Sequence, residues 1–266
     1  KKLAALGADA SAPLQRKPDG KAEALYLDSV VPGATLAAGL QAALDEAIAK
    51  LPIPKVMQYQ LESGHGPDFR PGWTSVSFVR PAHGLVALHG ADVVPVRALG
   101  LEAGRQTRGH RFEAAVDPVV LQDADHYERQ LLEQGSVIAG FGARRAEIRR
   151  QLDAAAAAEG LKPIDDEALL DEVTALVERP NVLTCRFEPE FLAVPQECLI
   201  LTMKANQKYF PLLDAAGKLT NKFLVVSNIS PEDTSFVTGG NERVVRPRLA
   251  DAKFFFDQDR KKTLAS

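Results

Sequence analysis

The sequence is poor in cysteine and has no long hydrophobic run. Its only cysteines, Cys185 and Cys198, are too few for a disulfide framework in 266 residues, which favours a reducing, cytoplasmic environment. No stretch of about 18 consecutive apolar residues occurs, so no membrane-spanning segment is expected. The apolar part of residues 1–6 is too short for a secretory signal, and the chain has no initiator Met. We therefore expect a piece of a longer chain.

Features that carry catalysis are also missing. The five histidines lack the spacing of zinc ligands, and no serine lies in a Gly-x-Ser-x-Gly turn. Gly140-x-Gly142 has neither a third glycine nor a phosphate-loop lysine. We expect no catalytic residue, no cofactor site and no metal site. The formal net charge of -3 argues against unspecific coating of nucleic acid, although a local basic surface stays possible.

Periodicity and turn residues predict an α+β fold. The chain is 45% hydrophobic and 25% charged, as in globular proteins. Helices packed on short, mostly antiparallel sheets are expected. Residues 1–118 are predicted to form a β-rich module with one long helix, and residues 119–266 a helical segment followed by an α/β segment that ends in a basic helix.

Individual elements follow from caps, breakers and hydrophobic spacing. The long helix of the first module is predicted from Thr35 to Lys50, packed on a sheet through Leu36, Leu40 and Leu44. Further helices are expected at 123–134, 140–159, 165–179 and from 195 onward. Strands or hairpins are expected at 85–96, 182–187 and 209–226.

The last long segment, residues 239–262, combines an apolar stripe with many cations. Asn241 is the predicted N-cap, and Val245, Leu249, Ala252 and Phe256 recur at helical spacing. From Asn241 to Lys262 the sequence has seven Lys or Arg against four Asp or Glu. Pro247 predicts a kink, or a helix that begins near it.

Two arginines flank a Gly-His pair at Thr107–Phe112. Arg108 and Arg111 could grip RNA phosphates or meet another subunit, with Gly109 permitting a tight turn. An internal ion-pair cluster is the alternative use of these guanidinium groups.

Two other basic groups leave similar alternatives. The helix at 140–159 has a basic face that is either solvated or bound to RNA, and solvation is favoured; its members are Arg144, Arg145, Arg149 and Arg150. Lys204 and Lys208 either reach a polar ligand or lie on a wet helix edge.

The segment Asn241–Phe255 carries a resemblance to a known family. It reads Asn-Glu-Arg-Val-Val-Arg-Pro-Arg-Leu-Ala-Asp-Ala-Lys-Phe-Phe, and it resembles the beta subunit of bacterial-type, two-subunit glycyl-tRNA synthetase. Residues 78–112 and 195–211 are similar to that family too. This chain departs from the family at Pro247, where a small residue is usual, and at Gly84, where Trp is usual.

The resemblance implies a division of labour between two chains. The alpha subunit forms glycyl-adenylate from glycine and ATP, with ATP and Mg expected there, and the beta subunit recognises tRNA, usually in a heterotetramer. In agreement, this chain has no class I or class II synthetase signature. The resemblance covers the N-terminal-to-middle portion of the subunit, and the fold is related by analogy to non-catalytic modules of the phenylalanyl-tRNA synthetase beta chain.

The predicted function is therefore a non-catalytic portion of a beta subunit that contributes to tRNA binding, to assembly with the alpha subunit, or to both. Its partners are the alpha subunit and tRNA(Gly), with no membrane. The predicted polyanion contacts are Arg108, Arg111, Arg243, Arg246 and Arg248. A pure scaffold is one alternative. An editing hydrolase is another, with His83 or His110 as its base.

Overall fold

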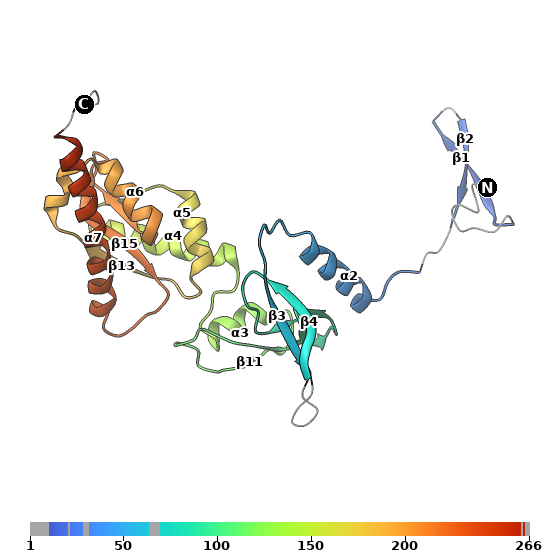
Figure 1. Ribbon diagram of the computed structural model, residues 1–266. Coiled ribbons are helices and arrows are strands. Elements are labelled where there is room, and N and C mark those ends of the chain that lie inside the picture. Colours follow the sequence, from blue (N-terminus) through green and yellow to red (C-terminus); the bar gives the residue numbers. More distant parts are fainter. Residues whose placement is uncertain (1–10, 21, 29–31, 64–69, 262, 264–266) are drawn as a thin grey trace. The chain divides into compact units, whose positions relative to one another are not determined.

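The computed structural model describes residues 11–20, 22–28, 32–63, 70–261 and 263 (Figure 1). The segment considered above as a secretory signal lies outside these residues. The chain divides into two compact units that interleave in sequence. Unit 1 comprises residues 1–80 and 94–100, and unit 2 comprises residues 81–93 and 101–266. The domain boundary expected after residue 118 stays a prediction.

The described residues of unit 1 form two antiparallel strand pairs, one helix and a short strand. Its elements are β1 (Leu14–Asp19), β2 (Ala22–Leu27), α2 (Leu36–Ala49), β3 (Met57–Ser63), β4 (Arg70–Phe78) and β8 (Arg97–Ala98). Strands β1 and β2 pair antiparallel, as do β3 and β4. The hydroxyl of Tyr59 on β3 donates to the carbonyl of Leu99 at 2.8 Å, which links the hairpin to the segment after β8.

Helix α2 is where the sequence predicts it, but its predicted role in a core is wrong. The Thr35 hydroxyl caps the helix by accepting the N–H of Ala38 at 3.3 Å. No residue of α2 is buried, and Leu36 is 52% exposed. The helix is held instead by the Gln41 amide, which accepts the N–H of Arg97 at 2.7 Å and donates to its carbonyl at 2.9 Å. Polar anchoring to β8 therefore replaces the expected apolar packing.

A four-stranded antiparallel sheet organises unit 2. The strand order is β12 (Lys162–Pro163), β14 (Phe210–Leu213), β15 (Leu219–Ser227) and β13 (Asn181–Arg186). The predicted strand at 182–187 and the predicted hairpin at 209–226 are confirmed. In the hairpin turn, Gly217 adopts a φ of 78°, and the Asp214 carboxylate accepts the N–H groups of Ala216 and Lys218 at 2.9 Å each.

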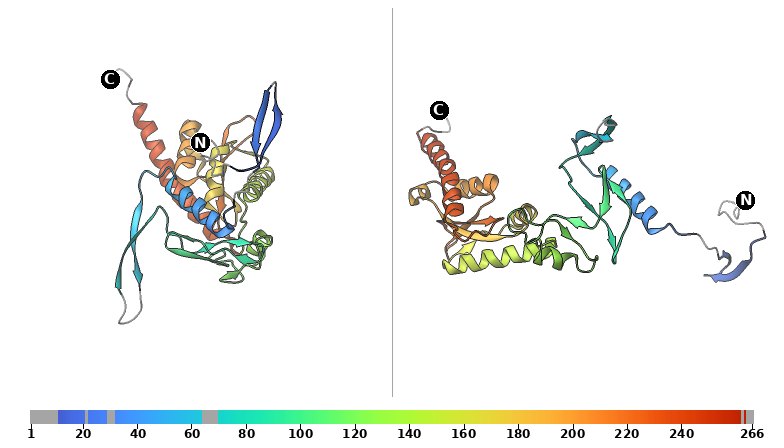
Figure 2. Two further views of the ribbon diagram at one scale, coloured as in Figure 1. Left: turned by 90° about the vertical axis from the view of Figure 1, so that its right-hand side faces the viewer. Right: turned by 90° about the horizontal axis from the view of Figure 1, so that it is seen from below.

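Helices cover both faces of this sheet (Figure 2). Alternate residues of β15 point to opposite sides, as a strand requires. Phe223 and Val225 join the cluster formed with α6 (Gln196–Gln207) and α7 (Ser235–Asp259), whereas Leu224 joins the cluster formed with α4 (Phe141–Ala158) and α5 (Glu167–Leu176). The α+β fold with short antiparallel sheets is thus confirmed, and the analogy to phenylalanyl-tRNA synthetase stays a prediction.

Smaller elements complete unit 2. They are β5 (Leu85–Val86), β6 (Leu88–His89), β7 (Asp92–Val93), β9 (Leu101–Gly104), β10 (Gln106–Thr107), β11 (Val119–Val120), α3 (Tyr127–Glu133) and the 3₁₀ helix η2 (Pro189–Ala193). The β6–β7 hairpin turns at Gly90, where the sequence predicts it, but it is shorter than predicted: β5 pairs parallel with β9, and residues 94–96 form no strand. Helix α3 begins four residues after the predicted start, because the Asp123 carboxylate binds the N–H of His126 at 2.8 Å and so forms a turn ahead of the helix.

The predicted start of the last helix is wrong. Helix α7 begins at Ser235, whose N–H donates to the Asp233 carboxylate at 2.9 Å, and it continues through Pro247. Asn241 does not cap it: its side chain accepts from the Tyr209 hydroxyl at 2.8 Å and donates to the Val237 carbonyl at 2.8 Å. The predicted apolar stripe is confirmed, with two fully buried members and two packed against them, namely Val245, Leu249, Ala252 and Phe256.

Candidate nucleic-acid interface

The turn that carries Arg108 and Arg111 is anchored by a buried histidine. His110 is 2% exposed. Its Nδ1 accepts the backbone N–H groups of Phe112 and Glu113 at 3.2 Å each, so the ring proton is assigned to Nε2. Nε2 then donates to the Asn228 carbonyl at 2.6 Å. Both ring nitrogens are occupied, which leaves His110 unsuited to act as the base of an editing hydrolase.

Gly109 is required by close packing, and not by the turn freedom that the sequence suggested. A Cβ at this position would lie 2.5 Å from the Cα of Gly135 and 2.6 Å from its carbonyl oxygen. The same Gly135 carbonyl accepts the N–H of His110 at 2.6 Å. The two backbones therefore touch, and only a residue without a side chain fits between them.

Arg108 and Arg111 are both exposed. In the part of the chain that the structure describes, neither forms a salt bridge, so the internal ion-pair cluster is not observed. The Arg111 guanidinium lies 6.0 Å from the centroid of the Phe112 ring, which is itself 77% exposed. The turn thus exposes the Phe112 ring and two arginine side chains that form no salt bridge with the described residues.

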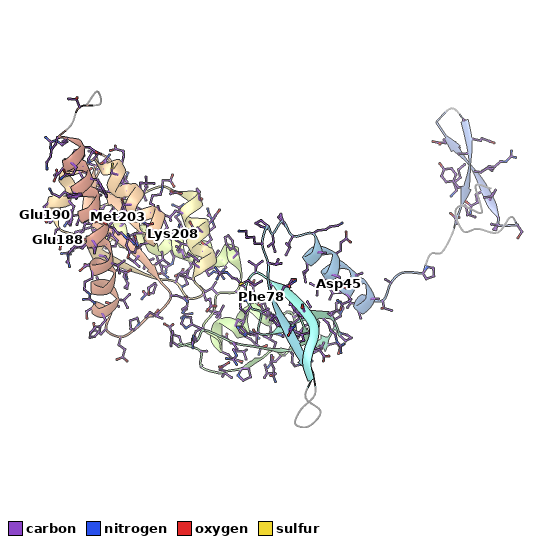
Figure 3. All side chains as sticks on the ribbon, in the orientation of Figure 1. Asp45, Phe78, Glu188, Glu190, Met203 and Lys208 are labelled. Atoms are coloured by element: carbon purple, nitrogen blue, oxygen red, sulfur yellow. The ribbon has the colours of Figure 1, made fainter. Side chains whose placement is uncertain are left out.

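The predicted arginines of α7 fall into two kinds. Arg243 and Arg248 are exposed and have no salt-bridge partner among the described residues. Arg246 Nε lies 2.5 Å from a carboxylate oxygen of Glu188, a residue that Figure 3 labels beside the helix. The backbone N–H of Glu188 and the Arg246 guanidinium together hold the pKa of that carboxyl below its usual value. The Arg246 guanidinium is therefore already bound to a carboxylate of the protein, which leaves fewer of its donors for a phosphate.

The arginine turn is fastened to the segment that leads into α7. His110 binds the Asn228 carbonyl, and the Glu113 carboxylate accepts the N–H of Ser230 at 2.5 Å. Helix α7 starts five residues later, and Arg243 follows its first residue by about 12 Å along the axis, at a rise of about 1.5 Å per residue. Unit 2 thus carries both arginine groups on connected elements.

The basic face of α4 is structural. Arg144 donates to the carbonyls of Ile138 at 2.6 Å and Thr174 at 2.9 Å. The other three members form salt bridges with carboxylates of α4, α5 and the residue before the α5 cap: Arg145 with Glu167 and Asp171, Arg149 with Asp165 and Glu167, and Arg150 with Glu147. The pairs of Arg145 and Arg149 fasten α4 to the α5 region, the Arg150–Glu147 pair lies within α4, and all of them reduce the charge available to RNA.

Lys204 and Lys208 are also paired with the α5 region. Lys204 binds Asp166, the N-cap of α5, and Lys208 lies 2.9 Å from Glu172. The bond from Lys204 is the largest cause of the lowered pKa of Asp166. Both lysines therefore join α6 to α5, which accounts for their spacing without a ligand.

A groove with a volume of about 1010 Å³ lies beside the arginine turn. Its polar lining includes His83, Gln106, Thr107 and Arg108. Arg105, which is not among the predicted site residues, also lines it and donates to the carbonyls of Ala91 at 2.7 Å and Gln122 at 3.2 Å. No sequence signal identifies Arg105, because its partners are backbone carbonyls of distant residues.

The described residues lack the features of two other kinds of site. They contain no group of three or more His, Cys, Asp or Glu side chains placed to hold a metal ion. None of their helices is long and apolar enough to cross a membrane.

Comparison with known proteins identifies the class as an aminoacyl-tRNA synthetase subunit. The matching family model is that of the glycyl-tRNA synthetase beta subunit, and it covers residues 2–266. The glycine–tRNA ligase beta subunit of Leptothrix cholodnii is 79% identical over 268 residues, which cover all of this chain and 36% of the relative. Those of Polaromonas naphthalenivorans and Paracidovorax citrulli are 75% and 74% identical, and each alignment covers all of this chain and 38% of the relative.

The chain therefore belongs to the glycyl-tRNA synthetase beta subunit family. It spans little more than a third of the length of these relatives.

Proposed function

We propose that this chain is a non-catalytic part of a glycine–tRNA ligase beta subunit that contacts tRNA(Gly) in the cytoplasm. Arg108, Arg111, Arg243 and Arg248 would bind the RNA backbone, with Arg246 in a lesser role. In this proposal the partner alpha subunit holds ATP and Mg and forms the adenylate. The observation that carries the RNA contact is the state of the first four arginines, which are exposed and without an acidic partner among the described residues.

The chemistry of the guanidinium group supports this assignment. An arginine presents a planar fork of donors that matches two phosphate oxygens, and it stays charged at any physiological pH. A guanidinium already bound to a carboxylate, such as that of Arg145, offers less to a phosphate. The exposed ring of Phe112 beside Arg111 adds a surface on which an unpaired base can stack.

Pre-organisation supports it as well. The bonds of His110 and Glu113 to the segment at 228–230 hold the arginine turn in place before any RNA arrives. Binding then has less backbone entropy to lose, so that more of the electrostatic attraction appears as affinity.

The test uses full-length beta subunit together with its alpha subunit. We expect Arg243→Ala/Arg248→Ala to weaken tRNA(Gly) binding, and to reduce the slope of log affinity against log salt by about one unit per phosphate-binding arginine. Arg108→Ala/Arg111→Ala should behave alike. Arg150→Ala is the matched control, because Arg150 is exposed but paired with Glu147.

The result separates RNA binding from a purely structural role. If both double variants assemble normally and keep the affinity and salt slope of the control, these arginines do not contact tRNA. If they bind tRNA normally but lose the alpha subunit in size-exclusion chromatography, the surface serves assembly.

A further inference from the structure

Helix α7 has a second apolar face, on the side opposite its buried stripe. The inner stripe is already packed in the core, since Val245 and Leu249 have no exposed surface. On the outer side, Phe236 is 79% exposed, Phe254 58%, Phe255 62% and Val244 49%. Figure 1 shows α7 beside α6 and β13, whose residues belong to the cluster that buries the inner stripe.

These outer residues form two adjoining lines along the helix. At about 3.6 residues per turn, residues seven or eleven apart lie nearly above one another. Phe236, Pro247 and Phe254 therefore make one line, and Val244 and Phe255 make the next. We call these five residues the outer apolar face.

Charged residues border this face in the manner of a protein interface. By the same helical spacing, Arg243 lies on the outer margin of the first line and Arg248 on that of the second, and the exposed Asp251 lies between the two lines. Exposed aromatic and aliphatic side chains with arginines at their rim are typical of surfaces that another protein element covers. RNA phosphates could bind the arginines at the margin of the face, but the apolar side chains of Phe236 and Val244 cannot bind a phosphate.

We propose that in the full-length protein the outer apolar face of α7 packs against a segment of the same polypeptide that lies outside these 266 residues. The 79%-identical relative has roughly two-thirds of its length outside the matched region, which is ample for a covering segment. Attachment to the same chain also gives such a segment a high effective concentration at the face. This inference does not depend on the proposed RNA contact.

A second copy of the chain fits the face less well. A two-fold symmetric contact would place the same face against itself. The Arg243 and Arg248 side chains of both copies would then border one buried patch, and like charges at close range oppose association. The covering element is expected to bring apolar side chains to the two lines and a polar partner to Asp251, which lies between them.

Thiol labelling of full-length beta subunit tests the proposal. Phe254→Cys and Val244→Cys are made separately in a Cys198→Ser background, since Cys198 is the exposed native cysteine of this region and Cys185 is buried. Asp153→Cys, at an exposed position of α4, is the control. Labelling by a maleimide, without tRNA, is followed by mass spectrometry of the labelled peptide.

We expect both thiols on α7 to react at least about tenfold more slowly than the control in the isolated beta subunit, a ratio that corresponds to about 1.4 kcal/mol in favour of the covered state. Protection should not change with protein concentration.

Rapid labelling of both variants would overturn the proposal. Protection that appears only with alpha subunit would instead assign the face to that subunit, and protection lost on dilution would assign it to a second copy. No RNA is present in the labelling experiment, so its outcome does not depend on whether the arginine variants change tRNA binding. The tRNA-binding experiment likewise does not depend on whether the thiols are protected.

Discussion

Replacing His110 by Ala tests whether the arginine turn is held as the structure indicates. The substitution removes one donor and one acceptor from a site that is 2% exposed. It leaves the Asn228 carbonyl, 118 residues away in sequence, without the donor that lies 2.6 Å from it. It also leaves the N–H groups of Phe112 and Glu113 without their shared acceptor.

The expected cost follows from these three groups. A buried polar group left without a partner costs about 1–3 kcal/mol. Phe112 is largely exposed, so water can replace the acceptor for its N–H and lower that share. We expect His110→Ala to lower the free energy of unfolding by about 2–4 kcal/mol, whereas Arg111→Ala, at the exposed neighbour, should change it by less than about 0.5 kcal/mol.

Two further variants separate the two halves of the network. His110→Asn places an acceptor near the position of Nδ1, and His110→Gln places a donor near that of Nε2. Each should recover part of the stability lost in His110→Ala. The assay is urea unfolding followed by far-ultraviolet circular dichroism, in which a stability change moves the midpoint and leaves the slope unchanged. A loss below about 0.5 kcal/mol in His110→Ala would refute the reasoning.

Three other substitutions have expected outcomes by the same measurement. Gly109→Ala forces a Cβ to within 2.6 Å of the Gly135 backbone and should cost about 1–3 kcal/mol. Pro247→Ala restores a backbone donor inside α7 and should stabilise the protein by about 1–3 kcal/mol. Hydrogen bonding from Arg150 lowers the pKa of Glu147 from 4.5 to about 2, so this pair stabilises the fold fully above the usual pKa. Glu147→Gln should therefore be less stable at neutral pH, and the difference should disappear as the pH falls from about 4.5 to about 2.

Each of these outcomes has a control or a contrary result. Gly142→Ala is the control for Gly109→Ala, because a Cβ at Gly142 meets nothing within 4 Å and alanine favours a helix. A loss of stability in Pro247→Ala would mean that packing of the proline ring contributes more than the backbone hydrogen bond that alanine restores. If the difference in stability between Glu147→Gln and the unsubstituted protein does not change with pH, the Glu147 carboxylate does not contribute to the loss of stability in acid.

Local sequence signals determined many elements of the fold. Thr35 before an apolar period starts α2, and Asp166 caps α5 by accepting the N–H of Leu169 at 2.9 Å. The turn residues around Gly90 and Gly217 form hairpins where they were expected. Caps and turns are readable because their hydrogen bonds join residues two to four positions apart.

The start of α7 could not be read in this way. Gly239 and Gly240 normally interrupt a helix, yet α7 runs through both. Buried contacts of Val245 and Leu249 with the sheet, and the bond from Tyr209 to Asn241, outweigh the weak local preference.

Sequence alone determined the family, through the segment Asn241–Phe255, and it identified the arginines that deserve testing. It could not decide which cations were free. Tertiary structure pairs Arg145 with α5 and Arg246 with Glu188, while Arg243 has no such partner in the described chain. The physical reason is that a charge is neutralised by whichever group the fold brings near it, and those groups come from residues tens of positions away along the chain.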